Sequence, residues 1–343
     1  MRLRPFVENI LVLGQSHLAN AVTEEMRKRR RYRILDLMEP GEPGRVFKDG
    51  VPFVGSLDRG LRTIPRTHRI VVALSERRGR LPLEALLDAK RQGVAIEDAV
   101  HLYERLTGKL ALDQLQPSHL IFAPELGRRS VHTMLLRLLS VLLAAVGLVV
   151  CAPLFALIAL LIKWDSAGPV FFVHERVGKD GRKFALVKFR TMHTVAASRS
   201  EWVRDNGDRI TAVGRWLRKY RLDELPQLFN ILMGDMNLIG PRPHPASNYH
   251  LFMRNIPFYA FRATVRPGIT GWAQVRYGYA NDLQEEIEKM HYDMYYIKYH
   301  SFRLDLEILV RTVAVVVLGN ESPRGGSTST KEDERRFDEQ SAA

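Results

Sequence analysis

An uncharged apolar run from Leu138 to Ile162 constrains this chain most, because few environments accept such a segment. As a helix, the run is long enough to cross the hydrocarbon core of a bilayer. Pro153 lies near its middle, where proline removes a backbone hydrogen bond and clashes with the preceding turn, so the helix should bend or break there. The sequence therefore predicts a membrane helix at 130–164 that is broken by proline.

Basic residues flank the apolar run on both sides. Arg128, Arg129 and Arg137 precede it, and Lys163, Arg176 and Lys179 follow it. Because loops rich in lysine and arginine stay in the cytoplasm, both ends are expected there, which a re-entrant helix satisfies. A straight single span, the commoner geometry, would place one basic flank outside, and both geometries stay open on this argument. The single cysteine, Cys151, fits folded parts in a reducing compartment.

Residues 1–125 alternate between strand-like and helix-like patterns, which predicts an open α/β sheet of Rossmann type. Strands are expected at 9–14, 32–37, 69–74, 94–97 and 119–122, with a helix at 18–30. The first turn, from Gly14 to Ala19, contains a single glycine and so lacks the G-x-G-x-x-G fingerprint of a dinucleotide site. We therefore expect an architectural or regulatory role for this domain.

The remaining chain predicts a membrane-embedded α+β domain at 165–319 and a disordered tail at 320–343. The whole chain is thus expected to be of the α/β class, an N-terminal Rossmann-like open sheet followed by the membrane-embedded domain. A partly apolar helix is expected at 304–318. Its spacing suits a helix that lies on the membrane, although an ordinary core helix has the same periodicity.

Two cations end a strand-like segment at 184–189. Lys188 and Arg190 suit phosphate groups, because arginine can fork onto two oxygens while lysine acts as a point charge. Taken alone, this pair could equally be a solvated basic edge.

Adjacent carboxylates, Asp223 and Glu224, follow the four cations of a short basic stretch, Arg215, Arg218, Lys219 and Arg221. Neighbouring carboxylates repel one another unless cations or a metal keep them ionised. An ionised carboxylate could attack phosphorus, and the second carboxylate could hold Mg²⁺ beside substrate phosphates. The alternative is an ordinary acidic first turn of a helix.

Two rigid turns carry further polar groups. Arg242 lies between Pro241 and Pro243, whose fixed φ angles restrict the backbone around the guanidinium, as a diphosphate clamp requires. Arg266 and Gln274 belong to a second turn rich in proline and glycine. Each turn alone is a weak signal of function.

In combination, these motifs resemble the bacterial sugar transferase family, the monotopic polyprenyl-phosphate phosphoglycosyl transferases. The resemblance covers about residues 130–318 and rests on four stretches: Lys188-Phe-Arg-Thr-Met, Leu222-Asp-Glu-Leu-Pro-Gln-Leu, Gly234-Asp-Met-Asn-Leu-Ile-Gly-Pro-Arg-Pro and Arg266-Pro-Gly-Ile-Thr-Gly-Trp-Ala-Gln. The N-terminal region resembles the Rossmann-like domain of the larger, exopolysaccharide-type members, which implies a non-catalytic, CoA-binding-like domain.

The resemblance implies a reaction and a place in the cell. A hexose-1-phosphate would pass from a UDP-sugar to polyprenyl (undecaprenyl) phosphate, initiating exopolysaccharide or other glycan synthesis at the cytoplasmic face of the bacterial inner membrane. Asp223 would be the nucleophile that forms a covalent phosphosugar intermediate and releases UMP, with Glu224 helping to bind Mg²⁺. Arg242 would contact donor phosphate or uridine, and Lys188 and Arg190 would lie near the active site.

The chain departs from the family pattern in two places. The family's membrane helix is re-entrant and broken at a Ser-Pro pair, for which this chain has Ala152-Pro153; because Pro153 is kept, the resemblance implies a re-entrant helix at 130–164. The several membrane helices that begin the larger members are missing, as in a short form or a truncated start. A homodimer through the N-terminal part is expected, and the donor sugar stays open.

The charge balance of the chain bears on two other function classes, a nucleic-acid-binding protein and a membrane scaffold. Lysine and arginine exceed aspartate and glutamate by 51 − 38 = 13, which fits anionic partners. No nucleic-acid motif or basic and aromatic stacking platform accompanies this charge, so we expect membrane lipid and phosphorylated substrates as partners, and no nucleic acid. The alternative function is a catalytically silent membrane scaffold or regulator of polysaccharide assembly.

Overall fold

The computed structural model describes residues 7–38, 67–74, 81–112, 131–194, 209–278, 280 and 282–318. The chain divides into two compact units between Ile121 and Phe122, close to the expected boundary at residue 125. The expected strand at 119–122, the basic residues Arg128 and Arg129, and the tail at 320–343 lie outside the described residues.

The first unit is an open sheet of parallel strands, as the alternating pattern predicted. Its described elements are β1 (Glu8–Leu13), α1 (His17–Arg27), β2 (Tyr32–Met38), β3 (Arg69–Val72), α3 (Leu83–Arg91), β4 (Ala95–Asp98) and α4 (Ala99–Thr107). The strand order is β2-β1-β3-β4, and every neighbouring pair runs parallel. This order is that of doubly wound folds, in which the chain reverses direction beside the first strand.

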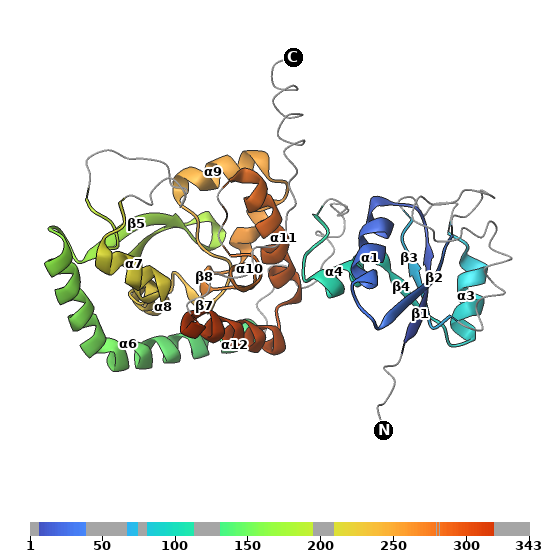
Figure 1. Ribbon diagram of the computed structural model, residues 1–343, viewed down its shortest axis with the longest axis horizontal. Coiled ribbons are helices and arrows are strands. Elements are labelled where there is room, and N and C mark those ends of the chain that lie inside the picture. The colour runs from blue at the N-terminus through green and yellow to red at the C-terminus, as the bar shows by residue number, and fades with distance from the viewer. Residues whose placement is uncertain are drawn as a thin grey trace, which may run out of the picture. The chain divides into compact units, whose positions relative to one another are not determined.

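Helices cover both faces of this sheet (Figure 1). Because successive side chains of a strand point to opposite faces, β1 contributes to two separate cores. Ile10 and Val12 pack with α1 and α4, whereas Leu11 and Leu13 pack with α3. The apolar continuity of β1 in the sequence thus reflects burial on both sides.

The first turn of this unit is closed by a serine. Ser16 is the N-cap of α1: its hydroxyl accepts a hydrogen bond from Ala19 N at 3.1 Å and donates one to Ala73 O at 2.8 Å. Gly14 has a φ of 119°, and a Cβ there would lie 2.6 Å from the backbone of Ala73. The single glycine is therefore needed where the turn passes the end of β3. The Ser16 side chain holds the rest of the turn through its two hydrogen bonds.

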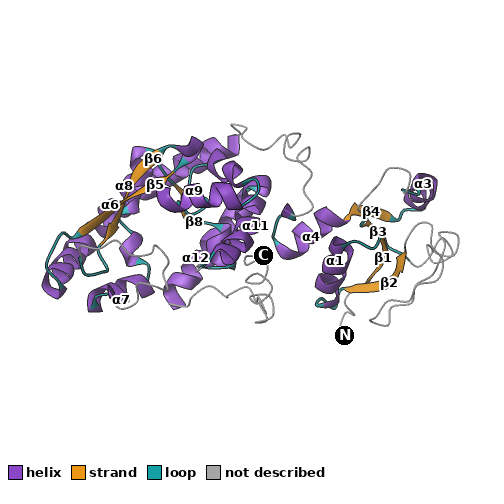
Figure 2. Ribbon diagram, turned by 90° about the horizontal axis from the view of Figure 1, so that it is seen from above, coloured by secondary structure: helices purple, strands orange, loops and turns teal. Residues whose placement is uncertain are grey.

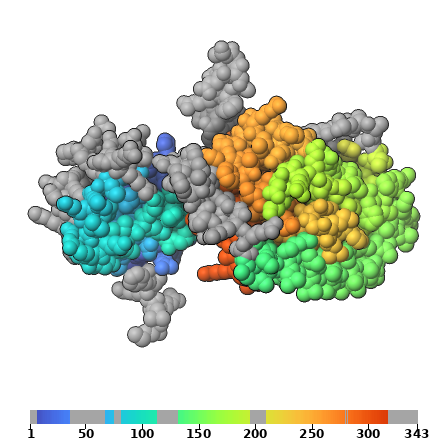
Figure 3. Space-filling model, turned by 180° about the vertical axis from the view of Figure 1, so that it is seen from behind, coloured from blue at the N-terminus to red at the C-terminus, as the bar shows by residue number. Residues whose placement is uncertain are grey.

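The second unit begins with one long helix, α6 (Val131–Asp165), which contains Pro153. The predicted break does not interrupt the helix, although Figure 1 shows α6 bent into two arms. The helix is long and apolar enough to cross a membrane, and only 11% of its most apolar stretch is buried. Figure 3 shows its green atoms at the surface of the unit. Entry and exit on one membrane face stays a prediction.

Short elements fill the rest of this unit. They are β5 (Phe171–Val177), η3 (Lys179–Gly181), β6 (Lys183–Phe189), α7 (Ala212–Lys219), η5 (Leu222–Glu224), α8 (Gln227–Met233), β7 (Asn237–Ile239), α9 (Ala246–Asn255), η6 (Tyr259–Thr264), β8 (Gly268–Thr270), α10 (Trp272–Arg276), α11 (Leu283–Tyr299) and α12 (Phe302–Leu318). β5 and β6 form an antiparallel ribbon beside α8, and β7 pairs with β8 in parallel (Figure 2).

The last helix confirms the prediction of a helix at 304–318. Leu304 and Ile308 of α12 pack in one core cluster with Leu136 of α6, while Leu306 and Val310 are exposed on the other side. The helix therefore joins the core and also presents an apolar face outward, as a membrane-surface helix does.

Candidate functional site

The adjacent carboxylates lie on η5, a single turn of 3-10 helix between α7 and α8. The chain enters this turn through Arg221, which has a left-handed conformation with φ 56°. Asp223 and Glu224 are both buried. Buried carboxylates are retained only when cations or hydrogen bonds compensate for the lost hydration, so their neighbours define the site.

Arg242 supplies the strongest compensation. Its Nη2 lies 2.8 Å from Glu224 Oε1 and its Nη1 lies 3.3 Å from Oε2, so one guanidinium holds both oxygens. Arg221 approaches the same carboxylate at 3.9 Å. The fold thus brings together Arg242 and Glu224, which are eighteen residues apart in the sequence.

The β7–β8 pair fixes the backbone on which Arg242 stands. Gly240 N donates to Thr270 O at 2.9 Å, and Gly268 N donates to Pro241 O at 2.9 Å. A Cβ on Gly240 would lie 2.4 Å from the backbone oxygen of Arg266. The glycines of the two predicted turns therefore let the turns pack directly against each other.

Lys188 reaches the same site from β6, and α8 fixes that strand. Asn230 of α8 accepts a hydrogen bond from Val187 N at 3.1 Å and donates one to Ala185 O at 2.7 Å. Its side chain thus bonds the backbone of β6 as a neighbouring strand would. Burial, together with the positive charge of Arg242, lowers the pKa of Lys188 to about 8. Lys188 is thus still largely protonated at pH 7 and contributes positive charge to the carboxylates.

The two carboxylates differ in acidity. Burial, together with the charge of Glu224, raises the pKa of Asp223 to about 6, against the pull of Lys188, Arg218 and Arg242. Burial also opposes ionisation of Glu224, but Arg242 and Lys188 outweigh it and lower the pKa of Glu224 to about 2. At pH 7 both groups are ionised, with Asp223 the more basic and therefore the better nucleophile.

Arg262, which no sequence motif marked, bonds the backbone that carries Arg242. Its Nε donates to Asp293 at 2.7 Å and its Nη2 donates to the backbone oxygen of Arg242 at 2.5 Å. His244 accepts from Arg262 through Nδ1 at 3.2 Å, and its Nε2 lies 3.1 Å from Glu286. Arg262 belongs to η6 and Asp293 to α11. Because the two residues are far apart in the sequence, no local motif predicts their pairing.

The structure does not bring Arg190 to the carboxylates. Its guanidinium donates to the backbone oxygens of Ser166 and Ala167 at 2.7 and 2.6 Å and to the Ser166 hydroxyl at 3.0 Å. These contacts tie the end of β6 to the segment that follows α6. The described contacts therefore give Arg190 a positioning role, and they lend no support to the expected phosphate contact.

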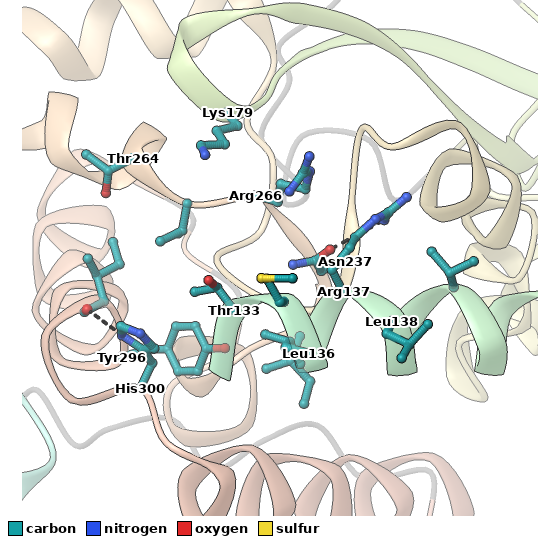
Figure 4. A pocket seen from close by; sticks show the side chains of 15 residues that line it. Thr133, Leu136, Arg137, Leu138, Lys179, Asn237, Thr264, Arg266, Tyr296 and His300 are labelled. Carbon is teal, nitrogen blue, oxygen red and sulfur yellow. Dashed lines mark hydrogen bonds between the residues drawn. The ribbon is translucent and has the colours of Figure 1, made fainter. Parts of the chain in front are cut away.

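Arg266 also lies apart from the carboxylates. Its Nε donates to Gly234 O at 3.0 Å, next to the end of α8, which Arg137 also caps through Ile231 O at 2.7 Å. The rest of Arg266 borders a cavity of about 560 Å³ together with Lys179 and apolar side chains of α6 (Figure 4). Substrate binding by Arg266 thus stays a prediction.

Gln274 shares a second cavity with Glu224. Its Nε2 donates to Ile269 O at 2.8 Å, which fixes the amide against β8. The cavity has a volume of about 230 Å³ and is lined mainly by aliphatic side chains of η5, α8, β8, α10 and α12. Gln274 is therefore close to the second carboxylate, but in an apolar setting.

The donor set fits Mg²⁺ shared with a substrate. Among the described residues, no group of three or more histidine, cysteine, aspartate or glutamate side chains could hold a metal ion. Mg²⁺ usually needs only one or two carboxylates when substrate phosphates and water complete its shell. Asp223 and Glu224 supply those two carboxylates, although Arg242 already occupies the oxygens of Glu224.

Comparisons with known proteins identify sugar-phosphate transferases as relatives. A relative from Aeromonas hydrophila, named UDP-N-acetylgalactosamine-undecaprenyl-phosphate N-acetylgalactosaminephosphotransferase, is 42% identical over 217 residues, 63% of this chain and 51% of the relative. A UDP-glucose:undecaprenyl-phosphate glucose-1-phosphate transferase of Xanthomonas campestris pv. campestris is 42% identical over 185 residues, 53% of this chain and 38% of the relative. The chain thus spans about half the length of these relatives or less.

A shorter relative is matched over most of its own length. The "Uncharacterized sugar transferase EpsL" of Bacillus subtilis (strain 168) is 40% identical over 190 residues, 54% of this chain and 89% of the relative. The family model described as "Bacterial sugar transferase" matches residues 131–319, more than half of the chain and all of the motifs above. The chain therefore belongs to the bacterial sugar transferase family.

Proposed function

We propose that this protein transfers a sugar-1-phosphate from a UDP-sugar to undecaprenyl phosphate at the cytoplasmic face of the bacterial inner membrane. Relatives of two sugar specificities, N-acetylgalactosamine and glucose, are equally identical to this chain, at 42%. Overall identity therefore supports the reaction class without selecting the donor sugar.

The observation that carries the proposal is the unequal pair on η5. Asp223 has a raised pKa, yet it is ionised at pH 7 and lies beside a carboxylate that Arg242 holds. In the proposed first step, an Asp223 oxygen attacks the sugar-linked phosphorus of the donor, and the bond from that phosphorus to the bridging oxygen breaks. UMP leaves with the electron pair, and the sugar phosphate remains on Asp223.

In the second step, a phosphate oxygen of undecaprenyl phosphate attacks the same phosphorus. The bond to Asp223 breaks, which regenerates the carboxylate and leaves an undecaprenyl diphosphate sugar. No proton has to be removed from either nucleophile at neutral pH, so the site needs positive charge more than a general base. Lys188, Arg218 and Arg242 supply that charge around Asp223.

Glu224, next to Asp223, would hold Mg²⁺, and the bound ion would supply positive charge where negative charge develops on the leaving UMP. The chain's own part is to keep both carboxylates ionised and aligned. Metal dependence can be read from donor binding as well as from turnover. Titration of UDP-sugar in EDTA should give at least a tenfold weaker affinity than in Mg²⁺, and equal affinities would remove the metal from the proposal.

The membrane location rests on α6 and on basic residues at both its ends, Arg137 and Lys163 among them. These charges support a cytoplasmic location for the catalytic unit by the positive-inside rule.

The proposal is tested by UMP release from purified protein in detergent, with Mg²⁺, undecaprenyl phosphate and a panel of UDP-sugars. Intact-mass measurement without acceptor should show the chain plus one sugar phosphate. Asp223→Asn should lose both signals, while Asp180→Asn, an exposed aspartate on η3, should keep them. Absence of UMP release from folded wild-type protein across the panel would favour the scaffold function instead.

A further inference from the structure

The 230 Å³ cavity beside Glu224 has a mainly aliphatic lining. Its aliphatic wall includes Leu225, Leu228, Leu238, Ile269, Val315 and Val316. A nucleotide sugar offers hydroxyl, phosphate and base groups, which would lose their hydration against such a wall. An apolar ligand is the one that gains from this site.

Four of the polar side chains in the lining bond other groups of the protein. Thr270 and Thr312 bond each other through their hydroxyls at 2.6 Å, Gln274 donates to Ile269 O, and Arg242 holds Glu224. Engaged polar groups add little to the recognition of a polar ligand, because each would first have to give up a partner. The cavity thus offers shape and apolar surface.

One wall of the cavity belongs to α12, which also has an exposed apolar side. Thr312, Val315 and Val316 face the cavity, whereas Val310 and Val313 of the same helix are exposed. Figure 1 shows α12 and an arm of α6 along one edge of the second unit. The cavity therefore lies directly behind a helix whose outer side suits lipid.

From these observations we infer that this cavity receives the phosphate-proximal isoprenoid units of the acceptor lipid, and that Val315 and Val316 determine acceptor binding. This inference rests on the proposed function, since it names the subsite for the second substrate. The cavity is smaller than the 300–1,000 Å³ of typical ligand pockets. It therefore holds only the isoprenoid units next to the phosphate, while the remaining isoprenoid chain stays in the membrane.

The placement has a chemical consequence. The acceptor phosphate must reach the sugar phosphate on Asp223, and Glu224, the next residue, lines the cavity. Arg221 also lines the cavity and carries the positive charge that a phosphate at its edge would meet. Apolar binding energy from the first isoprenoid units would thus hold the attacking phosphate beside the covalent intermediate.

The test fills the cavity and separates the two steps. Val315→Phe and Val316→Phe should form the sugar-phosphate adduct within twofold of the wild-type rate, because the donor does not use the cavity. Discharge of the adduct by undecaprenyl phosphate should slow at least tenfold. Val313→Phe adds the same ring on the exposed side of α12 and should leave both steps unchanged. Wild-type discharge in both filled variants would overturn the inference.

A binding measurement keeps the inference testable even if turnover is never seen. Native mass spectrometry of Asp223→Asn in detergent should show bound undecaprenyl phosphate, and adding Val316→Phe should reduce occupancy at least tenfold, while adding Val313→Phe should not. Loss of lipid in a protein that never releases UMP would uphold the cavity and refute the proposed reaction. Retained lipid in the filled variant would refute the cavity, whatever the activity.

Discussion

Arg242 places its two terminal guanidinium nitrogens on the two carboxylate oxygens of Glu224, at 2.8 and 3.3 Å. This fork lowers the pKa of Glu224 and leaves Asp223 as the carboxylate with the higher pKa. One arginine therefore separates the roles of two chemically similar neighbours.

Replacing Arg242 by lysine keeps the charge but removes the fork. Because planar bidentate contact distinguishes arginine from lysine, we expect UMP release to fall by about tenfold to a hundredfold, in line with roughly 1.5–3 kcal/mol for a charged hydrogen bond. Steady-state kcat/KM for the UDP-sugar is the measurement. Arg91→Lys, an exposed position in the first unit, is the matched control, and equal loss in both variants would contradict a specific role.

The raised pKa of Asp223 predicts the pH dependence of the first step. Below a pKa of about 6 the nucleophile is protonated, so single-turnover UMP release should fall tenfold for each pH unit below that value. A flat profile from pH 5 to pH 8 would show that the attacking group does not titrate near pH 6. UMP release should be measured as a burst without acceptor, because a later step then cannot limit its rate.

The same pKa predicts that Asp223 costs stability. The folded pKa lies above the ordinary value of 3.8, so the folded state binds more protons between these values and stability falls as pH rises through about 6. Asp223→Asn should therefore raise the free energy of unfolding at pH 7, on the order of 1–3 kcal/mol, while abolishing activity. Thermal unfolding in detergent should show a higher Tm, and Asp180→Asn should show none of this gain.

Arg262 and Asp293 offer a test of positioning. Asp293→Asn leaves a buried guanidinium without its carboxylate, which should destabilise the protein by about 3–5 kcal/mol. Arg262→Met with Asp293→Leu removes both charges, so stability should largely return. UMP release should stay low in the double variant, because Arg242 O has lost its donor. Full activity there would mean that the pair serves stability alone.

The geometry of α6 can be read from two single-cysteine variants. With Cys151→Ala as background, Val131→Cys and Trp164→Cys place exposed thiols near the two ends of the helix. A re-entrant helix should expose both to an impermeant maleimide in inverted vesicles and neither in intact spheroplasts. Labelling of one thiol from each side would establish a straight span.

The sequence alone determined the described strands of the first unit, its first helix, and the existence of α6 and α12. Local periodicity decides these features, because a strand or helix that buries one or both faces must carry the matching apolar pattern. The motif order also marked Asp223, Glu224 and Arg242, and the structure brings these three side chains together.

Only the tertiary structure decided which cations reach the carboxylates. Lys188 and Arg190 stand two residues apart on one strand-like motif, yet Lys188 joins Glu224 and Arg242 while Arg190 bonds the segment after α6. Side-chain direction at the end of a strand depends on what packs there, and motif spacing does not contain that information. Arg262 went unmarked for the same reason, since its partner Asp293 is thirty-one residues away. Long-range pairing and burial, which fix pKa values and cavities, arise only when the elements pack.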